Sequence, residues 1–152
     1  MTVLYITYDG LLDPLGPSQI LPYIKNISRH QNEVVVLSFE KSERLLHGKD
    51  ALLTDLQNYS IIWKPLLFTK GLGFIGKLID MSRMYLKAFI VVYKYNIKVV
   101  HTRSHPPAHV GLFIKRITKA KFIFDFRGLW VDERVDKGGW DLNRLFYRLQ
   151  YK

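Results

Sequence analysis

Short runs rich in β-branched and aromatic residues alternate along the chain with longer segments whose apolar residues recur at helical spacing. Nearly continuous apolar runs are typical of strands buried on both faces of a parallel sheet. We predict strands at residues 2–7, 33–39, 61–63, 98–102 and 121–125. Helices are predicted at about 17–29, 45–57, 74–95 and 107–118, and from about 141 onward. This order predicts an α/β fold, a Rossmann-like open parallel sheet of about five strands flanked by helices.

Three of these predicted elements lead to further expectations. Pro65 has no backbone N–H and is expected to end the third strand. The long helix at 74–95 is apolar around most of its circumference, so it should be largely buried or should meet a partner. Its narrow polar stripe consists of Asp80, Arg83, Lys87 and Lys94. The last helix reaches Lys152 without a closing cap, so residues 1–152 are expected to form one domain truncated within that helix.

Composition narrows the class of protein. A chain of 152 residues suits one globular domain with a substantial core. The absence of Cys excludes disulfides, thiolate metal ligands and Cys nucleophiles. The amino-terminal segment has no basic lead, and no window approaches the roughly 20 apolar residues that a spanning helix needs. We therefore expect a cytoplasmic protein.

The chain is strongly basic, and its charged residues are unevenly distributed. Lys and Arg number 23 against 13 acidic residues, which gives a net charge of +10. Residues 61–98 contain seven basic residues and Asp80 as their one acid, and residues 101–121 contain five basic residues and no acid. Such a field attracts phosphates, nucleic acid or anionic lipid headgroups without choosing among them. Most aromatic residues fall in predicted strands and helix faces, which argues against nucleic acid because no exposed stacking platform is indicated.

The glycine-rich segment 71–76 formally matches the dinucleotide-binding pattern G-x-G-x-x-G. That fingerprint requires the glycines directly after a strand and an acid at the end of the next strand. Here residues 65–70 intervene, and the next strand ends in His101-Thr102-Arg103. The phosphate-binding pattern G-x-x-x-x-G-K-[ST] also fails, because Leu78 replaces the hydroxyl residue. The sequence favours a glycine-loosened loop.

His101, His105 and His109 are spaced by four and suggest a zinc site on one helix face. However, His101 belongs to a predicted strand, and Pro106-Pro107 should prevent a continuous helix through His105. No Asp or Glu occurs between Asp80 and Asp125 to orient the rings. No metal site is expected, and His105 in its loop is a better candidate for binding substrate.

Polar residues gather in three loops that follow predicted strands, at residues 9–18, 103–107 and 125–134. In open parallel sheets ligands bind in the crevice beyond the carboxyl ends of the strands. Gly16 permits close backbone approach, and the helix start after it offers free N–H groups to a phosphate. Asp125 and Arg127 could merely pair and cap loops, but the three loops together favour a site for a polar, phosphorylated ligand.

Five segments in and around these loops resemble a known family. They are Leu4-Tyr5-Ile6-Thr7-Tyr8-Asp9-Gly10, Asp13-Pro14-Leu15-Gly16-Pro17-Ser18-Gln19, Leu21-Pro22-Tyr23, His101-Thr102-Arg103-Ser104-His105-Pro106-Pro107 and Phe124-Asp125-Phe126-Arg127-Gly128-Leu129-Trp130-Val131-Asp132-Glu133-Arg134. They resemble segments of GT-B glycosyltransferases of family 4, and the similarity covers nearly the whole chain in the same order. The resemblance implies two Rossmann-like domains facing a cleft, of which this chain is similar to the N-terminal, acceptor-side domain. The paired-glutamate motif of the donor-binding C-terminal domain is absent.

The resemblance implies roles for particular residues. Gly16 would approach the donor diphosphate, and Asp125 and Arg127 would lie at the reacting sugar. The family commonly carries a His where this sequence has Arg127, which leaves that role open between a phosphate and a sugar-hydroxyl contact. No metal and no cofactor is expected, because protein dipoles and cations stabilise the leaving diphosphate in many members. The acceptor is expected to meet Asp9, Arg103, Ser104, His105, Asp132 and Glu133.

The function implied is retaining transfer of a sugar from a nucleotide-sugar donor to a glycan or lipid-linked acceptor, in polysaccharide or cell-envelope biosynthesis. The isolated chain is expected to be inactive, since half of the transition-state contacts would be missing. The region Phe74 to Tyr95 could touch an anionic membrane surface at the inner face. Two alternatives stay open: a basic nucleic-acid or phosphate-binding module without catalysis, and a fragment completed by a separate chain.

Overall fold

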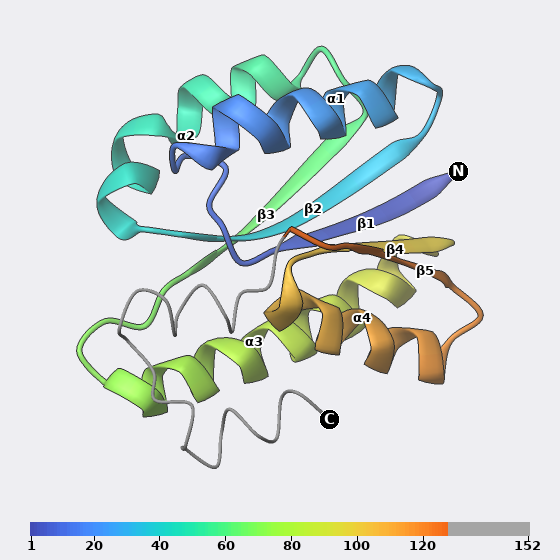
Figure 1. Cartoon of the computed structure of the whole chain (residues 1–152). Coiled ribbons are helices and arrows are strands. Elements are labelled where there is room, and N and C mark those ends of the chain that lie inside the picture. The colour runs from blue at the N-terminus through green and yellow to red at the C-terminus, as the bar shows by residue number, and fades with distance from the viewer. Residues whose placement is uncertain (128–152) are drawn as a thin grey trace.

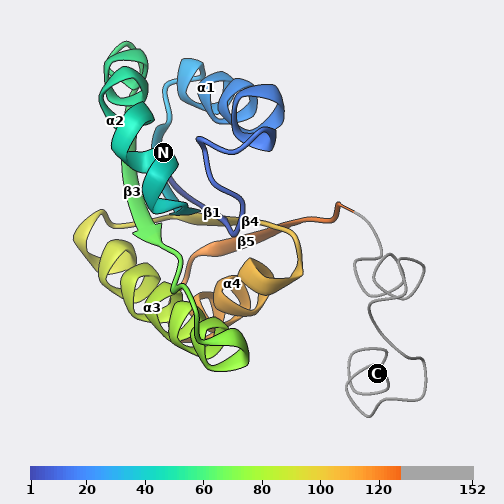
Figure 2. The same cartoon turned by 90° about the vertical axis from the view of Figure 1, so that its left-hand side faces the viewer.

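The computed structural model describes residues 1–127. Two helical layers enclose one sheet, with α1 and α2 on one face and α3 and α4 on the other (Figures 1 and 2). A π-helical segment, η1, leads directly into α1. In chain order the elements are β1 (Thr2–Thr7), η1 (Gly16–Ile20), α1 (Leu21–Arg29), β2 (Glu33–Glu40), α2 (Ser42–Leu56), β3 (Ile61–Leu67), α3 (Gly73–Lys94), β4 (Val99–Arg103), α4 (His105–Ile117) and β5 (Lys121–Asp125).

The strands form one parallel sheet in the order β3-β2-β1-β4-β5. The chain winds outward from β1 through β2 to β3, then crosses back to add β4 and β5 on the other side of β1. The carboxyl ends of β1 and β4 are therefore neighbours at the point where the winding reverses, and Thr7 pairs in register with Arg103 there. The predicted fold class, a Rossmann-like open sheet of five parallel strands, is confirmed.

Alternate residues of each strand enter different cores, as the two-residue period of a strand requires. Leu4 and Ile6 of β1 face α3 and α4 in one cluster with Met84. Tyr5 of the same strand lies in the other cluster, beside Ile24 of α1. This alternation decides which residues at the strand ends share a face, and so which can meet in one site.

Proline positions produced two wrong predictions. β3 continues through Pro65 to Leu67, because β3 is an edge strand and an edge strand tolerates a residue without an N–H. The helix α4 begins at His105, not at residue 107, and Pro106 and Pro107 occupy its first turn, where no helical N–H bond is required. His105 is thus the first residue of a helix and not a loop residue, while no helix runs continuously from His101 through it, as expected.

The polar stripe expected on α3 is also only partly right. Asp80 is 2% exposed, and its carboxylate accepts hydrogen bonds from the backbone N–H of Thr69 at 3.1 Å and from the Thr69 hydroxyl at 2.7 Å. Much of the apolar surface of α3 faces away from the sheet and is exposed, so the helix is not largely buried. Among residues 1–127 no helix is both long and apolar enough to cross a membrane.

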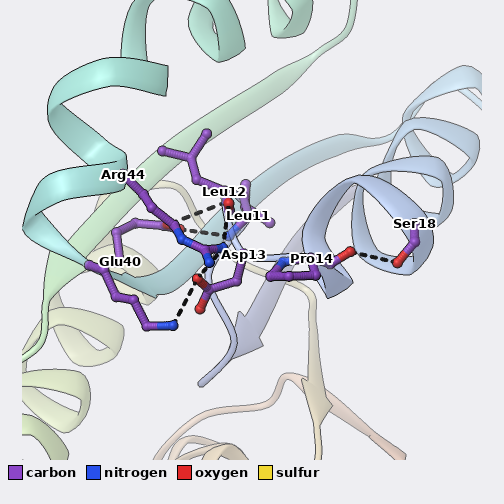
Figure 3. A network of polar contacts seen from close by, with 8 residues as sticks. Leu11, Leu12, Asp13, Pro14, Ser18, Glu40 and Arg44 are labelled. Carbon is purple, nitrogen blue, oxygen red and sulfur yellow. Dashed lines mark hydrogen bonds and ion pairs between the residues drawn. The ribbon is translucent and has the colours of Figure 1, made fainter.

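The loop at residues 8–15, between β1 and η1, is held by a buried carboxylate at the end of β2 (Figure 3). Glu40 is 1% exposed and accepts hydrogen bonds from the backbone N–H groups of Leu11 at 2.7 Å and Leu12 at 3.3 Å. The hydroxyl of Ser38 donates to the same carboxylate at 2.6 Å, and the indole of Trp63 donates to Ser38 at 2.9 Å. Burial raises the pKa of Glu40, and these hydrogen bonds oppose the rise.

Two glycines make this arrangement possible. A Cβ on Gly10 would lie 2.6 Å from the Glu40 carboxylate, and a Cβ on Gly16 would lie 1.9 Å from the carbonyl oxygen of Leu11. The backbone N–H of Gly16 donates to the Asp13 carbonyl at 2.8 Å, which closes the loop before η1. Asp13 is paired in turn with Arg44 at 2.7 Å, so α2 also helps to hold the loop (Figure 3).

We expect Gly16→Ala to destabilise the fold by about 3 kcal/mol, because the methyl group would overlap backbone atoms that cannot move aside. Gly48→Ala is the matched control: its Cβ would meet only the end of the flexible Leu12 side chain, and alanine in a helix gains about 0.5–1 kcal/mol. Thermal or urea unfolding measures both. Equal stabilities of the two variants would contradict this account of Gly16.

Replacing Glu40 with Ala should lower the free energy of unfolding by about 1–3 kcal/mol, since two backbone N–H groups and the Ser38 hydroxyl would lose their acceptor. The control is Glu43→Ala, which removes a carboxylate that is 83% exposed, and we expect a change within about 0.5 kcal/mol. Chemical denaturation compares the two variants with the wild type. A loss of stability in Glu43→Ala as large as in Glu40→Ala would refute the role given to burial.

Candidate functional site

Arg103 lies at the carboxyl end of β4, beside the end of β1, where the winding of the sheet reverses. Its side chain is 4% exposed and faces the α1 side of the sheet. The guanidinium donates to the Gln19 amide oxygen on η1 at 2.6 Å, and its Nε lies 3.5 Å from the Asp9 carboxylate. One buried cation therefore joins β4 to both the 8–15 loop and η1.

The pairing of this cation is incomplete. Nε and Nη1 of Arg103 are buried and make no hydrogen bond, and the buried hydroxyl of Tyr5 makes none either. Burial raises the pKa of Tyr5 to about 12, and the charge of Arg103 opposes that rise. Buried donors without acceptors are rare because each carries its desolvation penalty. These groups form a polar centre with hydrogen-bonding capacity left over for a further oxygen acceptor.

Two aromatic residues and a histidine adjoin the same centre. The His101 ring packs edge-on against Tyr5, with centroids 5.1 Å apart, and against Tyr23, with centroids 5.3 Å apart. The Tyr23 hydroxyl lies 3.4 Å from His101 Nδ1, within hydrogen-bonding distance. Burial lowers the pKa of His101, while the nearby charge of Asp125 acts in the opposite direction. Burial therefore favours the neutral imidazole, in which one ring nitrogen donates a hydrogen bond and the other accepts one.

Asp125 and Arg127 form the outer part of the site. Asp125 is the register partner of Arg103 on β5, and its carboxylate accepts a hydrogen bond from Arg127 Nε at 2.8 Å. The carbonyl of Asp125 accepts the backbone N–H of Ser104 at 3.1 Å. Ser104 itself has φ of +68°, so it turns the chain sharply from β4 into α4. The predicted pair is present, and it orients a half-exposed guanidinium at the edge of the sheet.

His105 lies apart from these residues. It packs edge-on against Phe124, with centroids 5.6 Å apart, and against Phe126 at 5.5 Å. Phe124 pairs with Thr102, whereas Asp125 pairs with Arg103, so His105 contacts a strand position that faces away from Arg103. The structure does not bring His105 together with the other candidates. Its helical position places it against the α4 side of the sheet.

The structure gives Gly16 a role in packing that the sequence did not reveal. Its open side is filled by the Leu11 backbone and its N–H is bonded within the loop. A contact with a donor diphosphate stays a prediction. Two further acceptor candidates, Asp132 and Glu133, and the expected last helix lie outside the described residues.

Sequence reasoning missed four residues that complete the centre: Tyr5, Gln19, Tyr23 and His101. Tyr5 and His101 had a usable signal. His101 precedes Arg103 by two residues in a strand, so the two side chains share a face, and Tyr5 is the register partner of His101 on the adjacent strand. Gln19 and Tyr23 had no such signal, because only tertiary packing places η1 and α1 over β4.

Chemically, the centre combines two guanidinium groups, two carboxylates, one imidazole and two phenols at one sheet edge. Guanidinium groups bind the oxygens of phosphates and carboxylates, so the arrangement suits a polar anionic ligand. Within residues 1–127 no group of His, Asp or Glu side chains is placed to hold a metal ion. Two surface hollows, of about 200 and 750 Å³, lie at the opposite, amino-terminal edge of the sheet, away from these groups.

No protein-family model matches the sequence, and a search of curated proteins gave no match. Among solved structures, the chain resembles a glycosyltransferase from Rickettsia africae ESF-5 at 15% identity, with a TM-score of 0.52 over 88% of this chain. The chain spans 33% of the length of that protein. It also resembles the C-terminal domain of a hydrogenase from Pyrococcus furiosus at 15% identity, with a TM-score of 0.60 over 82% of this chain and 90% of that one. Both likenesses, at 15% identity, show the fold alone, an open parallel sheet flanked by helices.

The buried His101 predicts a pH dependence of stability. Its pKa is lowered in the folded protein from 6.5, so the unfolded chain binds the proton more readily. Its contribution to stability is complete above pH 6.5 and is lost as the pH falls through the lowered folded value, by at most about 1.4 kcal/mol per pH unit. Unfolding free energies measured between pH 8 and pH 5 (roughly the range in which imidazole titrates) should fall less steeply in His101→Gln.

The control for this prediction is His109→Gln, which removes an exposed histidine of α4. Glu40 is common to all three proteins, so its own titration cancels in the comparison. The prediction fails if His101→Gln and the wild type keep the same slope across this range. It also fails if His109→Gln flattens the slope equally.

Proposed function

We propose that this chain is the acceptor-side domain of a glycosyltransferase, which transfers a sugar from a nucleotide-sugar donor to a hydroxyl of a glycan or lipid-linked acceptor. The observation that carries the proposal is the buried, half-paired Arg103 where the winding of the sheet reverses. Sites for phosphorylated ligands lie at that position in open parallel sheets. The likeness to a glycosyltransferase supports the proposal. Because a hydrogenase domain shares the same fold, the argument for the function rests on the residues of the site.

The proposal gives different roles to the outer pair, Asp125 and Arg127, and to the inner pair, Asp9 and Arg103. Arg127, held by Asp125 through a 2.8 Å hydrogen bond, would contact the leaving diphosphate or the sugar hydroxyls. Asp9 and Arg103 would position the acceptor, with the Asp9 carboxylate receiving its hydroxyl proton or hydrogen bond. Cations already oriented in this way stabilise developing negative charge without reorganising. Retention of configuration, independence of metal ions and the approach of Gly16 to the diphosphate belong to the same proposal.

The proposal assigns the donor nucleotide to a second, C-terminal Rossmann-like domain of GT-B type, as in family 4. It places the complete protein in the cytoplasm, in polysaccharide or cell-envelope biosynthesis. The 152 residues should by themselves bind acceptor weakly and transfer no sugar. A nucleic-acid-binding function has no comparable support, because neither structural neighbour is described in those terms.

A screen with UDP-sugars and GDP-sugars tests the proposal. It is run on this chain and on the same chain extended by the coding sequence that follows it. Transfer or hydrolysis is expected only in the extended protein. Arg127→Ala should lower the rate about 100-fold, as loss of one charge-stabilising donor does elsewhere. Arg29→Ala, at an exposed position in the last turn of α1, is the matched control and should leave the rate unchanged.

Each other result has a definite meaning. Nucleotide-sugar turnover by the 152 residues alone would place the donor site in this domain and overturn the division into two halves. Equal losses in Arg127→Ala and Arg29→Ala would remove Arg127 from the site. Silence from both proteins, together with steeply salt-dependent binding of RNA or DNA, would favour the non-catalytic alternative.

A further inference from the structure

The outward surface of α3 and α4 combines exposed apolar residues with an absence of exposed acids. We call this surface the α3–α4 face. Leu86 and Tyr93 are 63% and 60% exposed, values that are high for large apolar side chains in the middle and last turn of a helix. At 100° per residue the apolar residues of α3 fall on one continuous stripe opposite the core. The exposed apolar residues of the face are Ile75, Leu78, Ile79, Leu86, Phe89, Ile90 and Tyr93 of α3 and Leu112, Phe113 and Ile117 of α4.

The charges of this face have one sign. The only acid of α3 is Asp80, which is buried and hydrogen-bonded to Thr69, and α4 contains no acid. The sequence alone placed Asp80 on the polar stripe, so the acid-free character of the surface is visible only in the structure. Lys70 and Arg83 are excluded, because Lys70 is paired with Glu43 and because Arg83 lies 3.8 Å from the Asp80 carboxylate and donates to the Leu67 carbonyl. The remaining basic residues of the two helices are Lys77, Lys87 and Lys94 of α3 and Lys115 and Arg116 of α4.

An apolar stripe flanked by cations suits an anionic bilayer surface better than a second copy of the chain. A symmetric dimer would bring the same basic side chains of both copies together, at a net charge of +10 each, with no exposed acid of either helix to pair them. Lipid headgroups instead supply the missing negative charge, and the acyl boundary takes up the apolar stripe. Phe89 and Tyr93, whose ring centroids are 4.9 Å apart, provide aromatic residues of the kind enriched at that boundary.

We propose that the α3–α4 face docks the protein on an anionic membrane surface, with α3 lying in the plane of the headgroups. Its 22 residues span about 33 Å, enough to present the whole stripe at once. Arg103 bonds to Gln19 of η1, which leads into α1. Because α1 covers the face of the sheet opposite α3 and α4 (Figure 2), the docked protein keeps the candidate site uncovered. The inference does not depend on sugar transfer, because it rests on this surface alone.

Vesicle co-sedimentation of the 152-residue chain tests the proposal. The chain should sediment with phosphatidylcholine vesicles that contain phosphatidylglycerol, sediment weakly with phosphatidylcholine alone, and be released by salt. The double variant Leu86→Ser/Ile90→Ser should lower the partition coefficient about tenfold or more. Replacing Lys77 or Lys94 with Gln should lower it about fivefold each, the equivalent of roughly 1 kcal/mol per cation.

The matched control is Leu46→Ser, which removes an 80% exposed leucine from α2 in the opposite layer and should leave binding unchanged. Unfolding midpoints of all variants should equal that of the wild type, because every changed side chain is exposed. The proposal is overturned if Leu86→Ser/Ile90→Ser binds vesicles as tightly as the wild type, or if the wild type does not bind anionic vesicles at all. It is also overturned if light scattering shows a dimer that Leu86→Ser/Ile90→Ser converts to a monomer, since the face would then join two copies.

Discussion

The buried carboxylate of Glu40 fixes the loop from which the rest of the candidate site is assembled. It stands at the end of β2, where burial alone would disfavour its charge, and three hydrogen-bond donors surround it. Figure 3 shows Leu11 and Leu12, which supply two of these donors. Two of these donors are consecutive backbone N–H groups, those of Leu11 and Leu12. The carboxylate therefore accepts the backbone hydrogen bonds of residues 11 and 12, which lie outside the sheet and have no neighbouring strand to accept them. Loss of this acceptor would free the loop at the one point where it crosses the end of a central strand.

The consequences of that loop reach the site through η1. Gly16 lies against the Leu11 carbonyl so closely that no side chain fits, and this contact sets where η1 begins. Gln19 of η1 then meets Arg103, and Asp9 approaches Arg103 from the start of the same loop. The geometry around Arg103 thus depends on a carboxylate that is itself remote from the candidate chemistry. A buried cation with donors to spare is tolerated because this scaffold holds it and because nearby carboxylates offset its charge.

The fold and the candidate function rest on different kinds of observation. A glycosyltransferase and a hydrogenase domain share this architecture at equally low identity, so the sheet and its helices do not choose between them. The choice comes from charged side chains at the strand ends and from the surface chemistry of α3 and α4. Two faces of one sheet hold these features apart: Arg103 faces α1, and the exposed apolar stripe lies on the far side of α3. Substitutions at the candidate site and on the α3–α4 face therefore act on opposite sides of the sheet.

The sequence by itself determined the five strands, their parallel direction and the edge at which charged residues gather, because buried parallel strands have a distinctive composition and their carboxyl ends coincide. Only tertiary structure decided how deeply each side chain is buried and what it meets. Pro65 stays in a strand because that strand is an edge, and Asp80 is buried because the Thr69 backbone offers it donors. His105 lies on the wrong face for the site because α4 begins two residues earlier than expected. Local periodicity fixes the face of an element, whereas burial, pairing and solvent access depend on neighbours distant in the chain.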